Sequence, residues 1–235
     1  MQVVILAGGL GTRLPEYTKL IPKPMVKVGS KPILRHIINY YLSYGFNDFL
    51  IALGYKGNII KDYFKRNRIK GANIQLVNTG KKTLTGGRLK RLEPKINGRF
   101  FLTYGDGLSD VNIKKLLSFH KSNKKLVTVT AVKPIARFGE LKIKNNTVVN
   151  FKEKPNTSQG WINGGFFVME RNFLKFIKND QSILEREPLE NVSKRKQLAA
   201  FRHNRFWYCM DTKRERDVLN NLIKKGKAPW IRKNV

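Results

Sequence analysis

An apolar run followed by a glycine-rich loop places the strongest constraint on how this chain can fold. Residues 3–6 (Val-Val-Ile-Leu) form a short continuous apolar run, which is typical of a buried strand. Glycines follow at positions 8, 9 and 11. Because glycine has no Cβ atom, backbone N–H groups in such a loop can approach a polyphosphate closely. Arg13 and Lys23 add two positive charges, so the segment predicts a strand that ends in a binding loop for a phosphate-rich nucleotide.

Two common glycine-rich loops do not fit this spacing. A Walker-type loop closes with Gly-Lys-Ser or Gly-Lys-Thr, and no such ending follows here. The dinucleotide fingerprint has a third glycine at position 14, where this chain has leucine. Taken alone, a glycine-rich turn after a strand is equally compatible with a tight turn of no chemical role.

The whole string LAGGLGTRL (residues 6–14), followed by PKPM (22–25), closely resembles the signature of the sugar nucleotidyltransferases. These enzymes join a sugar 1-phosphate to a nucleoside triphosphate and release pyrophosphate. Further strings resemble, in the same order and over nearly the whole chain, the cytidylyltransferase branch of that family. The resemblance implies an enzyme that makes CDP-glucose, a precursor of deoxysugars in surface polysaccharides, from CTP and glucose 1-phosphate. The strings are NTGKKTLTGGRLKR (78–91), FLTYGDGLSD (101–110), EKP (153–155), INGGFFV (162–168), FWYCMDT (206–212) and KGKAPW (225–230).

Length and cysteine content limit the class of protein further. A chain of 235 residues can bury a sizeable core, and we expect one domain over residues 1–235. The resemblance implies a nucleotide-binding half at about 1–132 and a sugar-phosphate-binding half at about 133–235. The single cysteine excludes an internal disulfide and fits a reducing compartment. No signal peptide or membrane span is visible in the sequence, so we expect a cytoplasmic protein with no membrane partner.

The charge of the chain is unusual. Lys and Arg total 47 against 16 acidic residues, a formal net charge of +31. Such an excess is often a sign of nucleic-acid binding. Here the basic residues are scattered over every segment, with no aromatic-interleaved stripe that could stack bases, so nucleic acid is not the expected partner. A basic nucleic-acid-binding protein on this scaffold stays the alternative from another class.

Strand-like and helix-like segments alternate through the first half of the chain, which is typical of an α/β fold. We expect a three-layer α/β/α, Rossmann-like fold with a mixed, mainly parallel sheet, whose ligands lie beyond the carboxyl ends of the strands. Two helix starts are predicted: Ser30 caps a helix with Pro32 in its first turn, and Asp110 caps a helix that runs to about residue 122. The predicted strands cover 3–6, 49–53, 74–77, 100–104, 127–132, 166–169, 198–201 and 207–210, with a hairpin at 141–151.

The proposed reaction needs little acid–base chemistry. A sugar 1-phosphate is already an anionic nucleophile, so the protein has to position it and neutralise charge on the α-phosphate and the departing pyrophosphate. Arg13 is a permanently charged fork suited to the β- and γ-phosphates, and Lys23, between two prolines, directs a point charge at the α-phosphate. The family gives the matching Arg and Lys these roles.

Two carboxylates are candidate metal ligands. Asp106 follows an apolar run and stands between Gly105 and Gly107, which lets a nucleotide and a metal come close. Asp211 follows a second apolar run (206–210). By resemblance both bind Mg²⁺, which typically takes one or two carboxylates together with phosphate oxygens. A turn or capping role for Asp106 is the structural alternative.

The remaining candidate contacts depend mainly on the resemblance. The segment 83–88 is expected to read cytosine, although its Gly-Gly pair could equally be a turn that opens a helix. No histidine has a partner at metal-binding spacing, so structural or exposed roles are expected for His36, His120 and His203. Packing is expected for Trp161, Trp207 and Trp230. Nucleotide contacts are assigned to Leu6, Ala7, Gly8, Gly9, Gly11, Thr12, Arg13, Lys23, Thr83, Gly86, Arg88, Gly105 and Asp106, and sugar-phosphate contacts to Arg137, Lys154, Asn163 and Gly164.

One segment departs from the family pattern. Between the predicted helix that ends near residue 64 and the strand at 74, this chain has only a short basic link, where the cytidylyltransferases have a longer excursion. A homo-oligomer is therefore left open, as is use of UTP, dTTP or another hexose 1-phosphate.

Overall fold

The computed structural model describes residues 1–134, 140–152 and 160–232 and contains a seven-stranded main sheet. Its strand order is β12-β8-β11-β6-β1-β4-β5. The run β6-β1-β4-β5 is parallel, β12 is parallel to β8, and β11 is antiparallel to both of its neighbours. This mixed, mainly parallel sheet confirms the predicted fold class. The strands are β1 (Val3–Leu6), β4 (Asp48–Leu53), β5 (Asn73–Asn78), β6 (Phe100–Tyr104), β8 (Val127–Val132), β11 (Ile162–Met169) and β12 (Leu198–His203).

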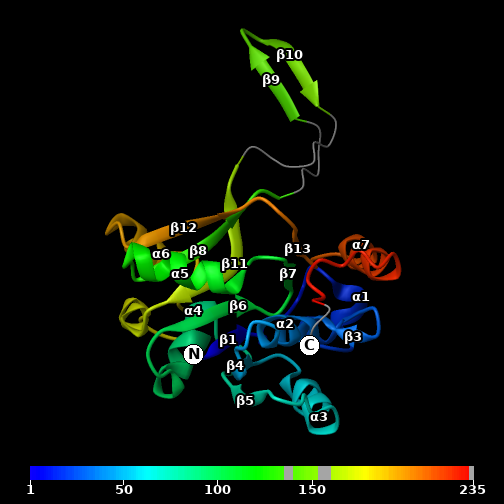
Figure 1. Cartoon of the computed structure of the whole chain (residues 1–235), viewed down its shortest axis with the longest axis vertical. Helices are drawn as coiled ribbons and strands as arrows, with labels where there is room; N and C mark the ends of the chain where they lie inside the picture. Colours follow the sequence, from blue (N-terminus) through cyan, green and yellow to red (C-terminus); the bar gives the residue numbers. More distant parts are fainter. Residues whose placement is uncertain (135–139, 153–159, 233–235) are drawn as a thin grey trace.

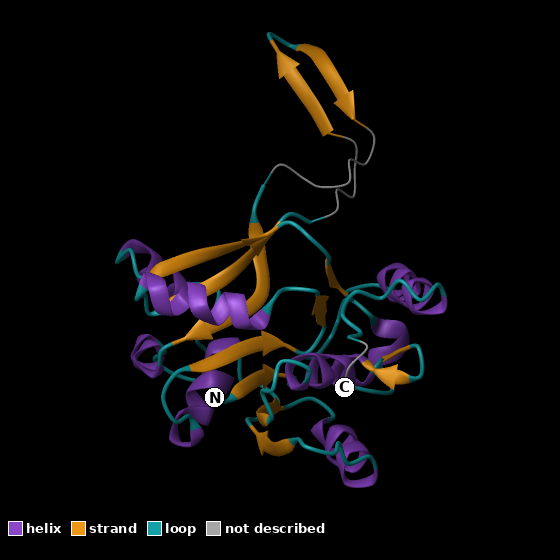
Figure 2. Ribbon diagram, viewed as in Figure 1, coloured by secondary structure: helices purple, strands orange, loops and turns teal. Residues whose placement is uncertain are grey.

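Helices cover both faces of this sheet and give the expected three layers (Figures 1 and 2). Side chains alternate along each strand, so Val3 and Ile5 join one core cluster while Val4 and Leu6 join the other. The first cluster also holds α2, α3, α5 and α7, and the second holds α4, α6 and the 3₁₀ helix η3. These helices are α2 (Ile33–Leu42), α3 (Gly57–Arg66), α4 (Thr85–Leu92), α5 (Ile113–Asn123), α6 (Glu187–Lys194), α7 (Lys213–Lys224) and η3 (Arg171–Phe176).

The carboxyl edge of the sheet brings together segments that are far apart in sequence. The parallel strands β1, β4, β5 and β6 all end there, and β11 begins there because it runs antiparallel to β6. The glycine loop after β1, the 79–88 segment after β5 and the Gly105–Asp106 turn after β6 therefore lie at one edge. Ligand sites of open α/β sheets occur at this edge.

The segment 207–210 does not complete the main sheet, so that prediction is wrong. The strand β13 (Trp207–Cys209) instead pairs antiparallel with β7 (Gly107–Ser109), and Cys209 lies opposite Gly107. This separate pair places the residues that follow β13 beside the turn that follows β6, because Met210 N donates to Asp106 O at 3.0 Å. The change of partner is non-local and no periodicity in the sequence signals it.

Both predicted helix caps are also wrong. Residues 31–32 form the short strand β3, which pairs with β2 (Lys27–Val28), and the helix begins after Pro32 rather than at Ser30. The helix α5 is capped by Asn112, whose side chain accepts from Lys115 N at 2.9 Å. Asp110 instead forms an ion pair with Arg205, at 2.9 Å, and contacts His203.

The predicted hairpin is present as β9 (Glu140–Lys144) and β10 (Thr147–Lys152), joined by two asparagines with positive φ. Figure 1 shows it extending away from the sheet layers. Its large apolar side chains are exposed: Leu141, Ile143, Val148, Val149 and Phe151. The expected single domain and the homo-oligomer that was left open stay predictions.

Within the described residues, the structure contains no helix that is both long and apolar enough to cross a lipid bilayer.

His36 has a structural role in the core, as predicted. Trp230 Nε1 donates to its Nδ1 at 3.3 Å, so the ring proton lies on Nε2, which donates to Val28 O at 2.8 Å. Burial lowers the pKa of His36 below 6.5, although the hydrogen bond to Val28 opposes this change. Burial likewise lowers the pKa of His120, which contacts Thr128 and Glu170.

We therefore expect the free energy of unfolding to fall as the pH drops below about 6.5. The unfolded chain takes up protons at these histidines near that pH, whereas the folded chain does so only at lower pH, so acid favours unfolding. Urea denaturation at pH 7.5 and pH 5.5 measures the effect. His36→Gln should lose part of the pH dependence, and an unchanged dependence in that variant would contradict the role assigned to His36.

Candidate active site

Hydrogen bonds at both ends hold the glycine loop in place. Ala7 N donates to Ala52 O at 3.0 Å, and Gly8 O accepts from Tyr55 N at 3.1 Å. Further on, Gly11 O accepts from the hydroxyl of Thr18 at 3.1 Å. Gly11 has φ +67°, a backbone conformation that favours glycine. The loop is therefore an anchored turn that leaves Gly9, Leu10 and Thr12 exposed.

Lys23 lies at the centre of the site. It begins the 3₁₀ helix η1 (Lys23–Met25), flanked by the two prolines noted in the sequence, and it is only 7% exposed. Its Nζ donates to Asp106 Oδ2 at 2.7 Å and to Asp211 Oδ1 at 2.6 Å. The structure thus brings Lys23 together with two other predicted residues: Asp106, which is 83 positions further along the chain, and Asp211, which is 188 positions further.

Arg13 completes this group of charges. Its Nη1 lies 2.8 Å from Asp211 Oδ2, while 71% of its side chain is exposed. A guanidinium in this position is held at one end and can still reach a bound anion. We call Arg13, Lys23, Asp106 and Asp211 the charge cluster.

A capping box fixes the position of Asp211. The carboxylate of Glu215 accepts from Asp211 N at 2.6 Å and from Thr212 N at 2.8 Å, and the hydroxyl of Thr212 accepts from Glu215 N. These bonds satisfy backbone donors at the start of α7. Sequence reasoning missed this support, although the Thr-x-x-Glu pattern at 212–215 is a readable helix-start signal.

Lys23 is charged in this environment. Burial alone would lower its pKa, but the Asp106 carboxylate and the hydrogen bonds to Asp106 and Asp211 outweigh burial, and the pKa lies above 10.5. Cys209 also lies close, since one ligand atom each of Asp106, Cys209 and Asp211 fall within 4.8 Å of one another. Burial, followed by the negative charge of Asp106, raises the pKa of the Cys209 thiol, which is therefore neutral.

The two aspartates fit the coordination chemistry of a hard divalent cation. Mg²⁺ prefers oxygen ligands and is usually held by one or two carboxylates, with water or phosphate oxygens completing the shell. Asp106 and Asp211 supply such oxygens just after the ends of β6 and β13. The neutral thiol of Cys209 is a soft donor, which Mg²⁺ does not favour.

Arg88 lies beneath the glycine loop and is 4% exposed. Its Nη1 donates to Thr79 Oγ1 at 2.9 Å and to Gly80 O at 2.7 Å. A Cβ atom at Gly8 would stand 2.3 Å from this nitrogen, so a larger residue there would require the Arg88 guanidinium to move. The side chain predicted to read the base is therefore bonded to residues that follow β5 and packs against Gly8.

A segment from the second half of the chain supports the predicted base-reading loop. Gly86 N donates to Ser182 O at 2.9 Å, and a Cβ atom at Gly87 would stand 2.4 Å from Asp180 O. The hydroxyl of Thr85 donates to Glu185 at 2.7 Å. The Gly-Gly pair therefore does open a helix against this segment, and Thr83 is buried beside it. Nothing in the sequence pairs 179–185 with 83–88.

The residues predicted to contact the sugar phosphate are described in part. Asn163 Nδ2 approaches the hydroxyl of Tyr104, at 3.5 Å, and Gly164 O accepts from Trp207 Nε1 at 2.6 Å. Tyr104 in turn donates to Glu185, so one polar chain links the sugar-side and base-side loops. Arg137 and Lys154 lie outside the described residues.

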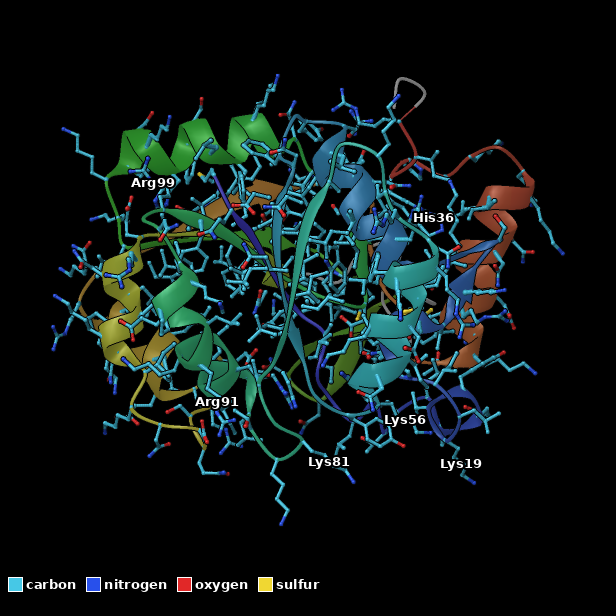
Figure 3. The ribbon with its side chains drawn as sticks, turned by 90° about the horizontal axis from the view of Figure 1, so that it is seen from below. Lys19, His36, Lys56, Lys81, Arg91 and Arg99 are labelled. Atoms are coloured by element: carbon cyan, nitrogen blue, oxygen red, sulfur yellow. The ribbon has the colours of Figure 1, made fainter. Side chains whose placement is uncertain are left out.

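Lysines gather near the glycine loop. Figure 3 shows Lys19, Lys56 and Lys81 together along one edge of the molecule. Lys56 donates to Lys19 O, and both Lys56 and Lys81 lie over the Tyr55 ring, at 5.2 and 5.8 Å from its centre. Because the backbone N–H of Tyr55 is bonded to Gly8, these charges stand near the glycine loop. They create a positive field that attracts anionic ligands.

One tryptophan prediction is wrong. Trp230 is buried against Phe206, and Trp207 is part-buried, as packing residues should be. Trp161 is 40% exposed, and its ring centre lies 5.3 Å from Lys133 Nζ and 5.8 Å from the Arg202 guanidinium. A ring near two cations gains from the cation–π attraction without being buried.

The fold and the charge cluster define a class of protein. A glycine loop at the carboxyl edge of an α/β sheet, two cations and two carboxylates suit a nucleotide-dependent phosphoryl or nucleotidyl transferase. The chain belongs to the nucleotidyl transferase family, whose profile matches residues 2–218. Members of this family generally use a divalent metal ion.

Particular relatives narrow this class. The chain is 44% identical to the glucose-1-phosphate cytidylyltransferase of Salmonella typhimurium over 98% of both proteins. It is 38% identical to the probable glucose-1-phosphate cytidylyltransferase of Bacillus subtilis over 98% of this chain and 99% of that protein. Among solved structures, it resembles HddC from Yersinia pseudotuberculosis complexed with GMP-PN, with a TM-score of 0.76, 25% identity and coverage of 94% and 99%.

The Salmonella alignment covers 253 positions, more than the 235 residues of this chain, so that relative has residues which this chain lacks. That the difference lies at the short link between α3 and β5 stays a prediction.

Proposed function

We propose that this enzyme transfers a cytidylyl group from CTP to glucose 1-phosphate and releases pyrophosphate. A phosphate oxygen of the sugar phosphate attacks the α-phosphorus of CTP, and the bond from that phosphorus to the β-phosphate oxygen breaks. The single observation that supports this most strongly is the charge cluster, in which two cations and two carboxylates meet at the edge where nucleotides bind.

Each member of the charge cluster has a role in this proposal. Lys23 neutralises charge that develops on the α-phosphate, and Arg13 binds the β- and γ-phosphates of the leaving pyrophosphate. Asp106 and Asp211 hold Mg²⁺, which supplies Lewis-acid polarisation of the phosphate when it is bound. No general base is required because the attacking group is already an anion.

Substrate recognition follows from the surrounding loops. We assign the backbone of residues 6–12 and Gly105, with Thr83, Gly86 and Arg88, to the nucleotide. Asn163 and Gly164, together with Arg137 and Lys154, are assigned to the sugar phosphate. The enzyme is proposed to act in the cytoplasm, where its one thiol stays reduced.

A pyrophosphate-release assay over a panel of substrates tests the proposal. Purified enzyme with Mg²⁺ is supplied with CTP, UTP, dTTP, GTP or ATP and with glucose, mannose or galactose 1-phosphate. We expect kcat/KM for CTP with glucose 1-phosphate to exceed that of each other triphosphate by about 10²-fold or more, because a site built to hydrogen-bond one base leaves polar groups unpaired with another.

Two alternatives give different outcomes. A preference for GTP would favour a guanylyltransferase, a reading that draws support from the HddC structure with its guanine nucleotide analogue. Salt-dependent binding of duplex DNA without any pyrophosphate release would favour the nucleic-acid-binding alternative.

A further inference from the structure

The charges of the cluster cancel in the free protein. Arg13 and Lys23 contribute two positive charges, and Asp106 and Asp211 contribute two negative charges. Three carboxylate oxygens already form ion pairs with cations: Asp106 Oδ2 and Asp211 Oδ1 with Lys23, and Asp211 Oδ2 with Arg13. The ammonium of Lys23 therefore bridges the same two side chains that a divalent cation would have to bridge.

A divalent cation must compete with this ammonium. It would bind the carboxylate oxygens at about 2.0–2.1 Å, and Lys23 Nζ now stands 2.7 and 2.6 Å from one oxygen of each. The two cations cannot share those oxygens without strong repulsion in a buried site. Because the cluster is neutral, an incoming cation also gains no net attraction from it until Lys23 or Arg13 moves away.

A triphosphate gives these cations another partner. Most of the Arg13 side chain is exposed, and Lys23 carries its charge on a flexible four-carbon stem, so each can turn from a carboxylate to a phosphate. The phosphates then neutralise the two basic side chains, and the two carboxylates are left to balance a divalent cation. Metal alone would leave the cluster with an excess of two positive charges, and the negative charge of a bound triphosphate removes this excess.

We propose that Lys23 acts as an internal cation that withholds Asp106 and Asp211 from divalent metal until a triphosphate binds. Metal and nucleotide consequently bind cooperatively, and the coupling is reciprocal. This inference rests on the proposed function in one respect: the anion that draws Arg13 and Lys23 away from the carboxylates is taken to be a nucleoside triphosphate.

Titration of the free protein with Mn²⁺, read by the electron paramagnetic resonance of unbound Mn²⁺, tests this directly. No nucleotide or sugar phosphate is present. Lys23→Met should bind Mn²⁺ at least tenfold more tightly than the unaltered protein. Arg13→Met should bind it more tightly by a smaller factor, because that guanidinium is largely in solvent. Adding Asp106→Asn to Lys23→Met should abolish the gain and so locate the ion.

Lys27→Met is the matched control. Lys27 is exposed on β2, four positions along the chain, and its substitution changes the net charge equally. Its Mn²⁺ affinity should stay within twofold. An equal gain in this control would overturn the proposal, since net charge alone would then explain the effect.

Folding of each variant is checked by thermal unfolding. A folded Lys23→Met protein that binds Mn²⁺ no more tightly would also overturn the proposal. If Lys23→Met does not fold, Arg13→Met decides the matter, because an exposed side chain can be truncated without disturbing the core. If the Mn²⁺ affinity of Arg13→Met does not rise, the proposal is overturned. A substrate panel with no pyrophosphate release would reject the proposed function but leave the Mn²⁺ result standing.

Discussion

Substitution of Lys23 by methionine is expected to lower kcat for pyrophosphate release about 10³-fold. The charge of this side chain is fixed by its buried position between two carboxylates, and the proposed reaction develops negative charge at the phosphate that Lys23 would contact. Methionine keeps most of the side-chain volume, so the loss reports on charge rather than packing. Initial rates at saturating CTP and glucose 1-phosphate measure the effect.

Lys27→Met is the matched control for this experiment too, and its kcat should stay within twofold of that of the unaltered enzyme. The same Lys23 variant is expected to bind metal more tightly, so weak metal binding cannot account for its slow turnover. Turnover equal to that of the unaltered enzyme would remove Lys23 from the mechanism.

Local signals in the sequence were sufficient for the parallel half of the sheet. The apolar run at 3–6 and the glycines after it predicted β1 and its loop, because a strand buried on both faces is apolar throughout and a close turn requires glycine. The asparagine pair at 145–146 likewise predicted the hairpin, since both positions need a positive φ that asparagine tolerates.

Non-local contacts account for most of the errors. Asp110 is a good capping residue by type, but its carboxylate contacts His203 and Arg205, which lie more than 90 positions later. Asn112 caps α5 instead. Ser30 loses its expected role because residues 31–32 join a strand pair. A single sequence shows which residues can cap a helix, but not which of them is engaged elsewhere.

The site illustrates the same limit. The resemblance named Arg13, Lys23, Asp106 and Asp211 as separate contacts with phosphate or metal, and the structure links all four through three ion pairs. That arrangement depends on the pairing of β13 with β7, which no motif predicts. Base reading by Arg88 stays a prediction, and the structure shows its donors engaged with Thr79 and backbone carbonyls beneath the loop.

Neutralising Asp211 is expected to lower kcat/KM by about 10²- to 10³-fold, the scale set by loss of one preorganised charge contact. Asp211→Asn keeps the size of the side chain and leaves the Glu215 contact to its backbone intact. It removes a carboxylate that both Arg13 and Lys23 contact, so both cations lose an anchor at once. Asp106 contacts Lys23 alone among these cations, so Asp106→Asn should perturb Arg13 less.

Asp217→Asn is the matched control, because this aspartate lies on α7 with half of its side chain exposed and loses the same charge. Its kcat/KM should stay within twofold. Metal dependence separates the two roles of Asp211: if it only orients the cations, the concentration of Mg²⁺ for half-maximal rate should not change in Asp211→Asn, whereas a metal ligand should raise it at least tenfold. A kcat/KM of Asp211→Asn within threefold of the unaltered enzyme would show that the Asp211 carboxylate is not required for catalysis.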